Sequence, residues 1–162
     1  MSGAAAHRQP GSGAAAGRAG AGPAGVPEEA APLLLDTHAW VWWVNGGPEL
    51  AARARRLVDA ARAEGRLWVS AISAWEVALL AQRGRLALRI PVREWIARCE
   101  ALDGLRFLPV DNAVAIRSVE LAGLHADPAD RMIAASAEHL GAVLVTRDER
   151  LGAWGGIPTV LA

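Results

Sequence analysis

Four acidic residues that lie far apart in the chain could together hold a metal ion. Asp36 and Asp148 each follow a short apolar run of the kind that forms a buried strand, and Glu76 begins the helix after another strand. Functional groups gather beyond the carboxyl ends of the strands in open parallel sheets, so we expect these three acids at one edge. Asp130 lies instead in the first turn of the helix before the last strand, and we expect the fold to bend it toward that edge.

Acids gathered at one edge would need a positive partner. Like charges at short range repel each other unless a cation neutralises them. Carboxylate oxygens suit hard divalent ions such as Mg²⁺ and Mn²⁺, which keep several water ligands and need few protein ligands. The chain has no His/Cys cluster at metal-ligand spacing, which argues against zinc. We therefore predict a Mg²⁺ site, in which Mn²⁺ can substitute, formed by Asp36, Glu76, Asp130 and Asp148.

Each acid also has an ordinary structural explanation. The stretch from Ser73 to Glu76 fits a capping box, and this reading is the better one for the glutamate taken alone. Asp127 resembles an aspartate cap before a proline, where the helix dipole would also favour Asp130. Asp36 could cap the first helix, and Asp148 could simply lie in a turn. Only the joint pattern favours metal binding.

The charge composition narrows the classes of enzyme that the chain can be. Its 17 basic residues, all arginine, balance 17 acidic ones, so any contact with nucleic acid must be local. The absence of lysine excludes a phosphate-loop lysine, a Schiff-base lysine and the lysine of phospho-acceptor aspartate domains. The single cysteine, Cys99, excludes an intramolecular disulfide and agrees with a reducing cytoplasm. A hydrophobic content of 52% is that of a globular protein in water, and no membrane partner is expected.

The composition of the chain changes at residue 32. Residues 1–32 are almost wholly Ala, Gly, Pro and Ser with scattered arginine, and they offer too little apolar surface to offset the entropy of ordering. We predict a disordered tail at 1–32 and one domain at 33–162, whose length is typical of a single domain. The tail lacks the strongly apolar run of a signal peptide, so we do not expect secretion, and we expect translation to start near Val26.

Strand and helix patterns alternate from residue 33 onward. Short apolar runs predict strands at 33–35, 67–69, 105–110 and 142–145, with a less regular edge strand at 157–161 that contains Pro158. Periodic patterns with start and stop signals predict helices from 37 to about 45 and at 48–64, 73–83, 91–102, 111–121 and 127–140. Strands separated by helices imply right-handed crossovers. We therefore predict an α/β fold of three layers, α/β/α, with a central, mostly parallel sheet of four to five strands.

Four segments of the chain resemble the PIN domain family and, within it, the VapC-type toxins of prokaryotic toxin–antitoxin pairs. The segments are Leu33-Leu34-Leu35-Asp36-Thr37-His38, Ser70-Ala71-Ile72-Ser73-Ala74-Trp75-Glu76, Leu124-His125-Ala126-Asp127-Pro128-Ala129-Asp130-Arg131 with Ile133-Ala134-Ala135-Ser136-Ala137, and Val145-Thr146-Arg147-Asp148. Any one segment would be weak evidence. Four in this order and spacing, each on the expected element, make the resemblance specific, and it covers most of residues 33–162.

The resemblance implies roles for individual residues. Asp36 and Asp130 match the main metal ligands of the family, and Glu76 matches the acid that supports the metal or its water. Asp148 follows a Thr-Arg pair after which family members vary, so it either binds the metal through water or only shapes the site. Four further residues are expected to support the ligands or to contact substrate: Asp127, Thr37, Arg131 and Thr146. For Asp127, a helix cap is an equally good reading.

The resemblance also implies a function. We expect a metal-dependent endoribonuclease that hydrolyses RNA phosphodiester bonds and acts as the toxin of a toxin–antitoxin pair in the cytoplasm. Metal-assisted hydrolysis of this kind needs no covalent enzyme intermediate. The partners that the resemblance implies are a cognate VapB-type antitoxin and a second copy of the chain, in a homodimer. The alternative is a catalytically inactive PIN-like module that binds RNA or protein.

Side chains next to the acids have two readings each. Three arginines could hold RNA phosphates or simply form surface ion pairs: Arg131, Arg147 and Arg150. His125 either faces solvent from a loop or contacts substrate. Trp40 and Trp43 share one face of the first helix and are expected in the core. Trp42 is then left as a candidate contact for a dimer partner or an antitoxin.

Overall fold

The computed structural model describes residues 31–162. The tail predicted at 1–32 therefore lies outside the described residues except for its last two. Those two contact the domain: the carbonyl of Pro32 accepts a hydrogen bond from the N–H of Val143 (2.9 Å), and the carbonyl of Ala31 accepts one from the Arg66 guanidinium. These two hydrogen bonds attach the chain to the domain before its first strand begins.

Five parallel strands form one sheet in the order β3-β2-β1-β4-β5. The strands are β1 (Leu33–Leu35), β2 (Leu67–Ser70), β3 (Leu105–Leu108), β4 (Val143–Thr146) and β5 (Thr159–Leu161). The predicted sheet of four to five mostly parallel strands is confirmed. The edge strand β5 begins directly after Pro158, which has no N–H to donate to a neighbouring strand.

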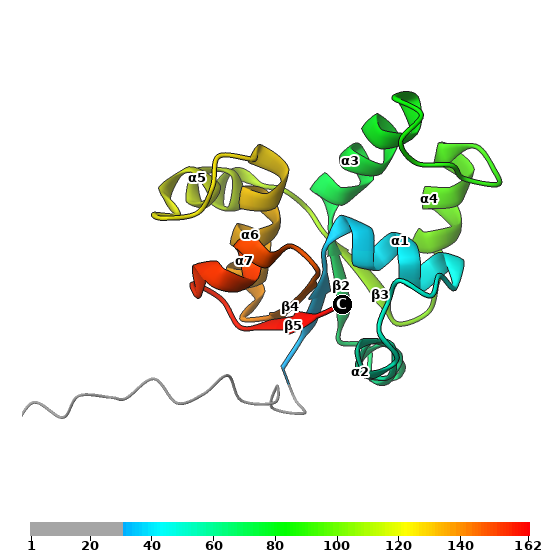
Figure 1. The fold of residues 1–162 in the computed structure, drawn as a ribbon, viewed down its shortest axis with the longest axis horizontal. Helices are drawn as coiled ribbons and strands as arrows, with labels where there is room; N and C mark the ends of the chain where they lie inside the picture. Colours follow the sequence, from blue (N-terminus) through cyan, green and yellow to red (C-terminus); the bar gives the residue numbers. More distant parts are fainter. Residues whose placement is uncertain (1–30) are drawn as a thin grey trace, which may run out of the picture.

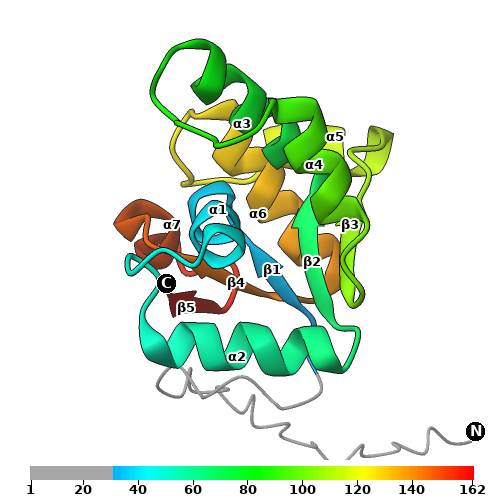
Figure 2. The same ribbon diagram turned by 90° about the vertical axis from the view of Figure 1, so that its right-hand side faces the viewer.

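Helices cover both faces of this sheet, as Figures 1 and 2 show. They are α1 (Thr37–Asn45), α2 (Ala52–Ala63), α3 (Ala71–Gln82), α4 (Val92–Glu100), α5 (Asn112–Glu120), α6 (Pro128–Leu140) and α7 (Glu149–Trp154). One layer contains α5, α6 and α7, and the opposite layer contains α1, α2 and α4 (Figure 1). The three-layer prediction is confirmed. Within residues 31–162, none of the helices has both the length and the apolar composition needed to cross a membrane.

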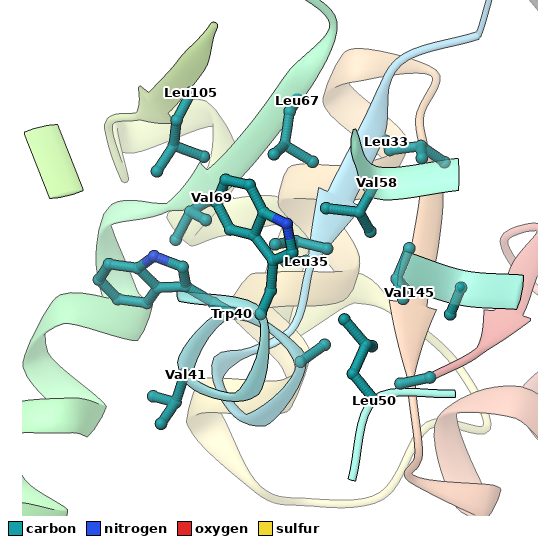
Figure 3. Close-up of a cluster of buried hydrophobic side chains, with 14 of the residues drawn as sticks. Leu33, Leu35, Trp40, Val41, Leu50, Val58, Leu67, Val69, Leu105 and Val145 are labelled. Carbon is teal, nitrogen blue, oxygen red and sulfur yellow. The ribbon is translucent and has the colours of Figure 1, made fainter. Parts of the chain in front are cut away.

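The central strand β1 explains why the strand segments are apolar throughout. All three of its leucines are buried, because helices cover both faces of the sheet. Leu33 and Leu35 belong to the core cluster that includes α1, α2 and α4, whereas Leu34 belongs to the cluster with α5, α6 and α7. Trp40 is fully buried in the first cluster, close to Leu35 (Figure 3), and Trp43 is also buried there. The predicted core positions of these two tryptophans are confirmed.

The observed helices differ from the predicted ones in two places. The helix predicted at 48–64 begins at Ala52, because the preceding residues form a turn that carries the Leu50 side chain into the core. The helix α7 was not predicted at all. Asp148 accepts a hydrogen bond from the N–H of Arg150 and caps this helix, where only a turn was expected. The other predicted elements lie within a few residues of their expected limits.

Candidate active site

One pocket at the carboxyl edge of the sheet brings the predicted acids together. It has a volume of about 500 Å³. Its lining includes the four acids predicted as metal ligands and the acid predicted to support them: Asp36, Glu76, Asp130, Asp148 and Asp127. Asp36 lies between β1 and α1, Asp148 lies between β4 and α7, and Glu76 lies in α3. The convergence expected from the topology of a parallel sheet is therefore observed.

Asp130 reaches this pocket without any bend in the fold, contrary to expectation. The helix α6 runs back across the sheet to the point where β4 begins, so its first turn lies at the carboxyl edge. Asp127 is the N-cap of this helix: its side chain accepts hydrogen bonds from the N–H groups of Ala129 (3.0 Å) and Asp130 (3.4 Å). The capping interpretation of Asp127 is correct, and the cap also places a second negative charge next to Asp130.

Asp36 combines a structural role with a place in the pocket. One of its oxygens accepts a 2.6 Å hydrogen bond from the N–H of Ala39 and so caps α1. The hydroxyl of Thr146, at the end of β4, accepts a 3.0 Å hydrogen bond from the N–H of Asp148. Burial raises the pKa of Asp36 above its ordinary value, and the nearby Thr146 hydroxyl and the N–H of Ala39 offset part of that rise. Capping uses only part of the accepting capacity of the carboxylate, which leaves it able to bind a cation as well.

The capping-box interpretation of Glu76 is wrong. Strand β2 passes directly into α3, so Ser73 is the third residue of the helix rather than its cap. Glu76 instead accepts a 2.6 Å hydrogen bond from the hydroxyl of Thr37, which lies in α1. Because Thr37 and Glu76 both line the pocket, this contact fixes the direction of the Glu76 carboxylate there. It is the kind of contact expected of a residue that supports a metal ligand.

Negative charge accumulates around Asp130. Burial, together with the charges of Asp127, Asp148 and Glu76, raises the pKa of Asp130 from 3.8 to about 7. The imidazole of His125 is half-buried, and its Nε2 lies 3.5 Å from one carboxylate oxygen of Asp130. The solvent-facing interpretation of His125 is therefore wrong. Burial is the largest cause of this rise, the three neighbouring acids add to it, and the positive charge of Arg150 offsets only part of it.

The arrangement fits a divalent cation. His125, Asp130 and Asp148 each offer a ligand atom, and these atoms lie within 4.8 Å of one another. Arg150 pairs directly with Asp148: its guanidinium donates to the two oxygens at 2.9 and 3.3 Å and holds the pKa of Asp148 below its ordinary value. Its charge also lowers the pKa of Asp130. Among these groups, the carboxylate oxygens are the ligands that suit Mg²⁺ or Mn²⁺. His125 was absent from the predicted ligands, although its place two residues before Asp127 could have suggested it.

Comparison with known proteins identifies the family of this chain. A model of the PIN domain family matches residues 33–155. The chain belongs to the PIN domain family. It is also 37% identical over 120 residues to Ribonuclease VapC22 of Mycobacterium tuberculosis, an alignment that covers 74% of this chain and 88% of that protein. The resemblance to PIN domains of the VapC type, inferred from four short segments, is confirmed.

Several solved structures share the fold. FitAcB from Neisseria gonorrhoeae superimposes with a TM-score of 0.58 at 23% identity, over 80% of this chain and 96% of that one. DNA-bound VapBC from Salmonella typhimurium superimposes with a TM-score of 0.56 at 22% identity, over 80% of this chain and 97% of that one. At these identities the likeness concerns the fold, which is the parallel sheet with helices on both faces.

Arg131 of this PIN domain is held by the backbone instead of facing the pocket. Its guanidinium donates to five carbonyls at 2.7 to 3.3 Å: those of Ser118, Val119, Leu121, Leu124 and His125. These carbonyls belong to the end of α5 and the following loop, where helical partners are missing. The expectation that Arg131 supports the ligands or contacts substrate is therefore corrected. Its contacts show a structural role, because they fix the loop that leads to the first turn of α6.

The rim of the PIN domain pocket is aromatic and basic. Trp42 and His38 line it from α1, with their ring centroids 5.7 Å apart. The guanidinium carbon of Arg147 lies over the Trp42 ring, 5.1 Å from its centroid. Trp42 is also the candidate contact for a dimer partner or an antitoxin, and this expectation remains a prediction. The structure places Trp42 among the residues that line the acidic pocket.

A second hollow of about 700 Å³ lies near the end of α2 and the loop before β3. Its polar side chains are already engaged in the domain: Asp59 accepts a 2.8 Å hydrogen bond from the Trp43 indole, and the Nε of Arg62 donates at 2.8 Å to the carbonyl of Asp103. Opposite charges mix around this hollow, so it lacks the concentration of like charge that makes the acidic pocket a candidate metal site.

Proposed function

We propose that the chain is a metal-dependent endoribonuclease that hydrolyses RNA phosphodiester bonds and acts as the toxin of a toxin–antitoxin pair. The observation that carries this proposal is the convergence of five carboxylates in one pocket, where burial and the neighbouring acids raise the pKa of Asp130 to about 7. A ribonuclease that is 37% identical over most of the chain supports the same activity. Mg²⁺ is the proposed ion, and Mn²⁺ can replace it.

Each acid has a part in this proposal. Asp36 and Asp130 bind the ion, with Asp148 and Glu76 completing the negative environment. The hydroxyl of Thr37 holds Glu76 in place, and the hydroxyl of Thr146 accepts a hydrogen bond from the N–H of Asp148. When bound, the ion supplies the chemistry of hydrolysis, because it increases the acidity of water and offsets negative charge that develops on the phosphate. The protein side chains position the reactants and keep their carboxylates aligned in the pocket.

Cleavage of RNA tests the proposed activity. Purified protein should cut a labelled RNA with Mg²⁺ or Mn²⁺, lose this activity in a chelator, and regain it when the metal is restored. Asp36→Asn and Asp130→Asn should each abolish cleavage with the fold retained by circular dichroism. Asp111→Asn is a matched control, because Asp111 also caps a helix but does not line the pocket. Binding of RNA without cleavage in either metal would contradict the proposal and indicate a non-catalytic module.

The toxin part of the proposal needs a partner. Solved structures with this fold include a toxin–antitoxin complex from Klebsiella pneumoniae, at 22% identity and a TM-score of 0.54. We propose that this chain acts in the cytoplasm, forms a homodimer and is inhibited by a small VapB-type antitoxin that covers the acidic pocket. Expression of the chain alone should arrest growth, and co-expression of the short protein encoded next to it should relieve the arrest. Growth arrest that persists in the Asp130→Asn variant would contradict a role of RNA cleavage in toxicity.

A further inference from the structure

The lining of the pocket has two parts of opposite electrostatic character. We call the acids its floor, and we call Trp42, His38 and Arg147, of which His38 and Arg147 are exposed, its rim. The Arg147 side chain is exposed, and within residues 31–162 its guanidinium forms no ion pair. Arg150, the other arginine of the pocket, is bound to Asp148. Arg147 is thus the pocket arginine whose charge is available to a ligand.

The contact with Trp42 explains why Arg147 does not turn inward to neutralise the acids. A guanidinium that lies over an indole ring gains a cation–π interaction, which is strongest with tryptophan. Stacking uses the face of the guanidinium and leaves the N–H groups along its edge free to donate. Those N–H groups match the geometry of a phosphate, which they can bind in a bidentate manner. Trp42 therefore holds Arg147 at the rim in a form that is ready to bind an anion.

The same rim offers surface for a nucleobase. Unpaired bases stack on aromatic rings and on arginine planes, whereas bases inside a duplex are already stacked on each other. Trp42 is half-buried, so part of its ring is accessible, and the His38 ring lies beside it. A pocket of about 500 Å³ is within the range that holds a small ligand. The Trp42 ring can contact the base of a nucleotide, and the Arg147 guanidinium can contact its phosphate, next to the proposed metal-binding acids.

We propose that Trp42 and Arg147 form a subsite for the nucleotide next to the cleaved phosphodiester, and that this subsite selects RNA whose base is unpaired. Arg147 binds the neighbouring phosphate through the edge of its guanidinium, and the base stacks on the accessible part of the Trp42 ring. The subsite rests on the proposed ribonuclease activity, and it adds the means by which that activity chooses its substrate.

Binding of a fluorescent 12-nucleotide RNA, single-stranded or annealed into a duplex, tests the subsite. Ca²⁺ replaces Mg²⁺ so that binding is measured apart from cleavage, and a gel verifies that the RNA stays intact. Trp42→Ala should weaken binding of the single strand about 5- to 100-fold, and Trp42→Phe should retain most of it. Arg147→Ala should reduce the slope of log affinity against log salt by about 0.7, the value for one phosphate of a single strand. The duplex should bind weakly to all variants.

Two measurements distinguish loss of the subsite from a general loss of structure. Arg56→Ala removes an exposed arginine of α2 that does not line the pocket, and it should leave the affinity and the salt dependence unchanged. Mn²⁺ affinity, measured without RNA by calorimetry, should be the same in wild type, Trp42→Ala and Arg147→Ala, because none of the acids is altered. Loss of RNA binding with unchanged metal binding supports the subsite.

Two outcomes would overturn the proposed subsite, and a third would overturn the proposed catalytic activity. If the wild type cleaves RNA with Mg²⁺ but both rim variants bind the single strand as tightly as wild type, the subsite is wrong and the proposed function stands. If the variants keep RNA binding and instead lose binding of the co-expressed small protein, the rim is a protein interface. If the rim variants lose RNA binding while the wild type never cleaves in any metal, the subsite stands and the proposed catalytic activity fails.

Discussion

The crowding of negative charge around Asp130 should make the metal-free protein less stable as the pH rises. Because the pKa of this carboxyl is about 7 in the folded protein and 3.8 ordinarily, the folded state holds the proton more tightly than the unfolded chain. The loss of stability should begin near pH 4 and be complete above pH 7. Asp130→Asn removes the charge, so the variant should exceed wild type by about 1–3 kcal/mol at pH 8 and differ little at pH 4. Urea unfolding of both proteins, in the presence of a chelator, measures their free energy of unfolding at each pH.

Wild type must be compared with Asp130→Asn because other groups titrate in the same pH range. Burial also raises the pKa of Asp36, for example, and its contribution has the same sign. The difference between wild type and Asp130→Asn cancels such shared contributions. A difference that stays constant from pH 4 to pH 8 would show that Asp130 is not destabilised by its neighbours in the folded protein.

The sequence could identify the acids but not most of their partners. Residue type and position after a strand are visible in the chain, and these placed Asp36 and Asp148 at the right edge. The partner of Glu76 lies 39 residues away in Thr37, and the contact depends on how α1 packs against α3. Local pattern instead favoured a capping box for Glu76. The direction of the His125 ring is likewise set by a turn whose geometry the residue types do not specify.

At the scale of the element, Arg131 should stabilise the connection between α5 and α6. It satisfies five carbonyls that would otherwise lack protein partners, and a hydrogen bond from a charged donor contributes more than a neutral one. We expect Arg131→Ala to lower the free energy of unfolding by about 2–4 kcal/mol. Arg131→Lys should lose most of the same amount, because one ammonium group cannot reproduce the planar set of donors. Urea unfolding measures the loss, and hydrogen exchange should locate it at residues 118–125.

Arg117 provides the matched control on the same pair of helices. It pairs with Glu138 and Glu120, but these ion pairs are on the surface and are screened by solvent. Arg117→Ala should therefore change the free energy of unfolding much less than Arg131→Ala. Wild-type stability in Arg131→Ala, together with weaker RNA binding, would restore the original interpretation of this arginine as a phosphate contact.

Helix ends were predictable where a side chain caps them and unpredictable where tertiary packing sets them. Asp111 and Asp127 mark the starts of α5 and α6 within one residue, since an aspartate cap is a local feature. The start of α2 depends on burial of Leu50, which no local pattern reveals. The six residues of α7 are too few to show a periodic apolar pattern.

For the whole molecule, alternation of strands and helices was sufficient to predict a parallel sheet, but not the order of its strands. The order matters for function because it makes β1 and β4 neighbours, and their ends carry Asp36 and Asp148. The same topology returns α6 to the carboxyl edge, which brings in Asp130. The expectation of a bend there was wrong because it overlooked that a crossover helix must run opposite to the strands that it connects.

A fold that gathers uncompensated carboxylates should be stabilised as a whole by the ion that it binds. A ligand that binds only the folded state at 100 times its dissociation constant adds about 2.7 kcal/mol, which for a domain of this size raises Tm by roughly 8 °C. Saturating Mg²⁺ or Mn²⁺ should give such a rise in thermal unfolding, and chelator should reverse it. Asp130→Asn should abolish the rise, whereas Asp111→Asn, which removes a cap outside the pocket, should keep it. A rise of equal size in Asp130→Asn would place the stabilising ion away from the acidic pocket, because that variant removes the carboxylate on which the charges of Asp127, Asp148 and Glu76 converge.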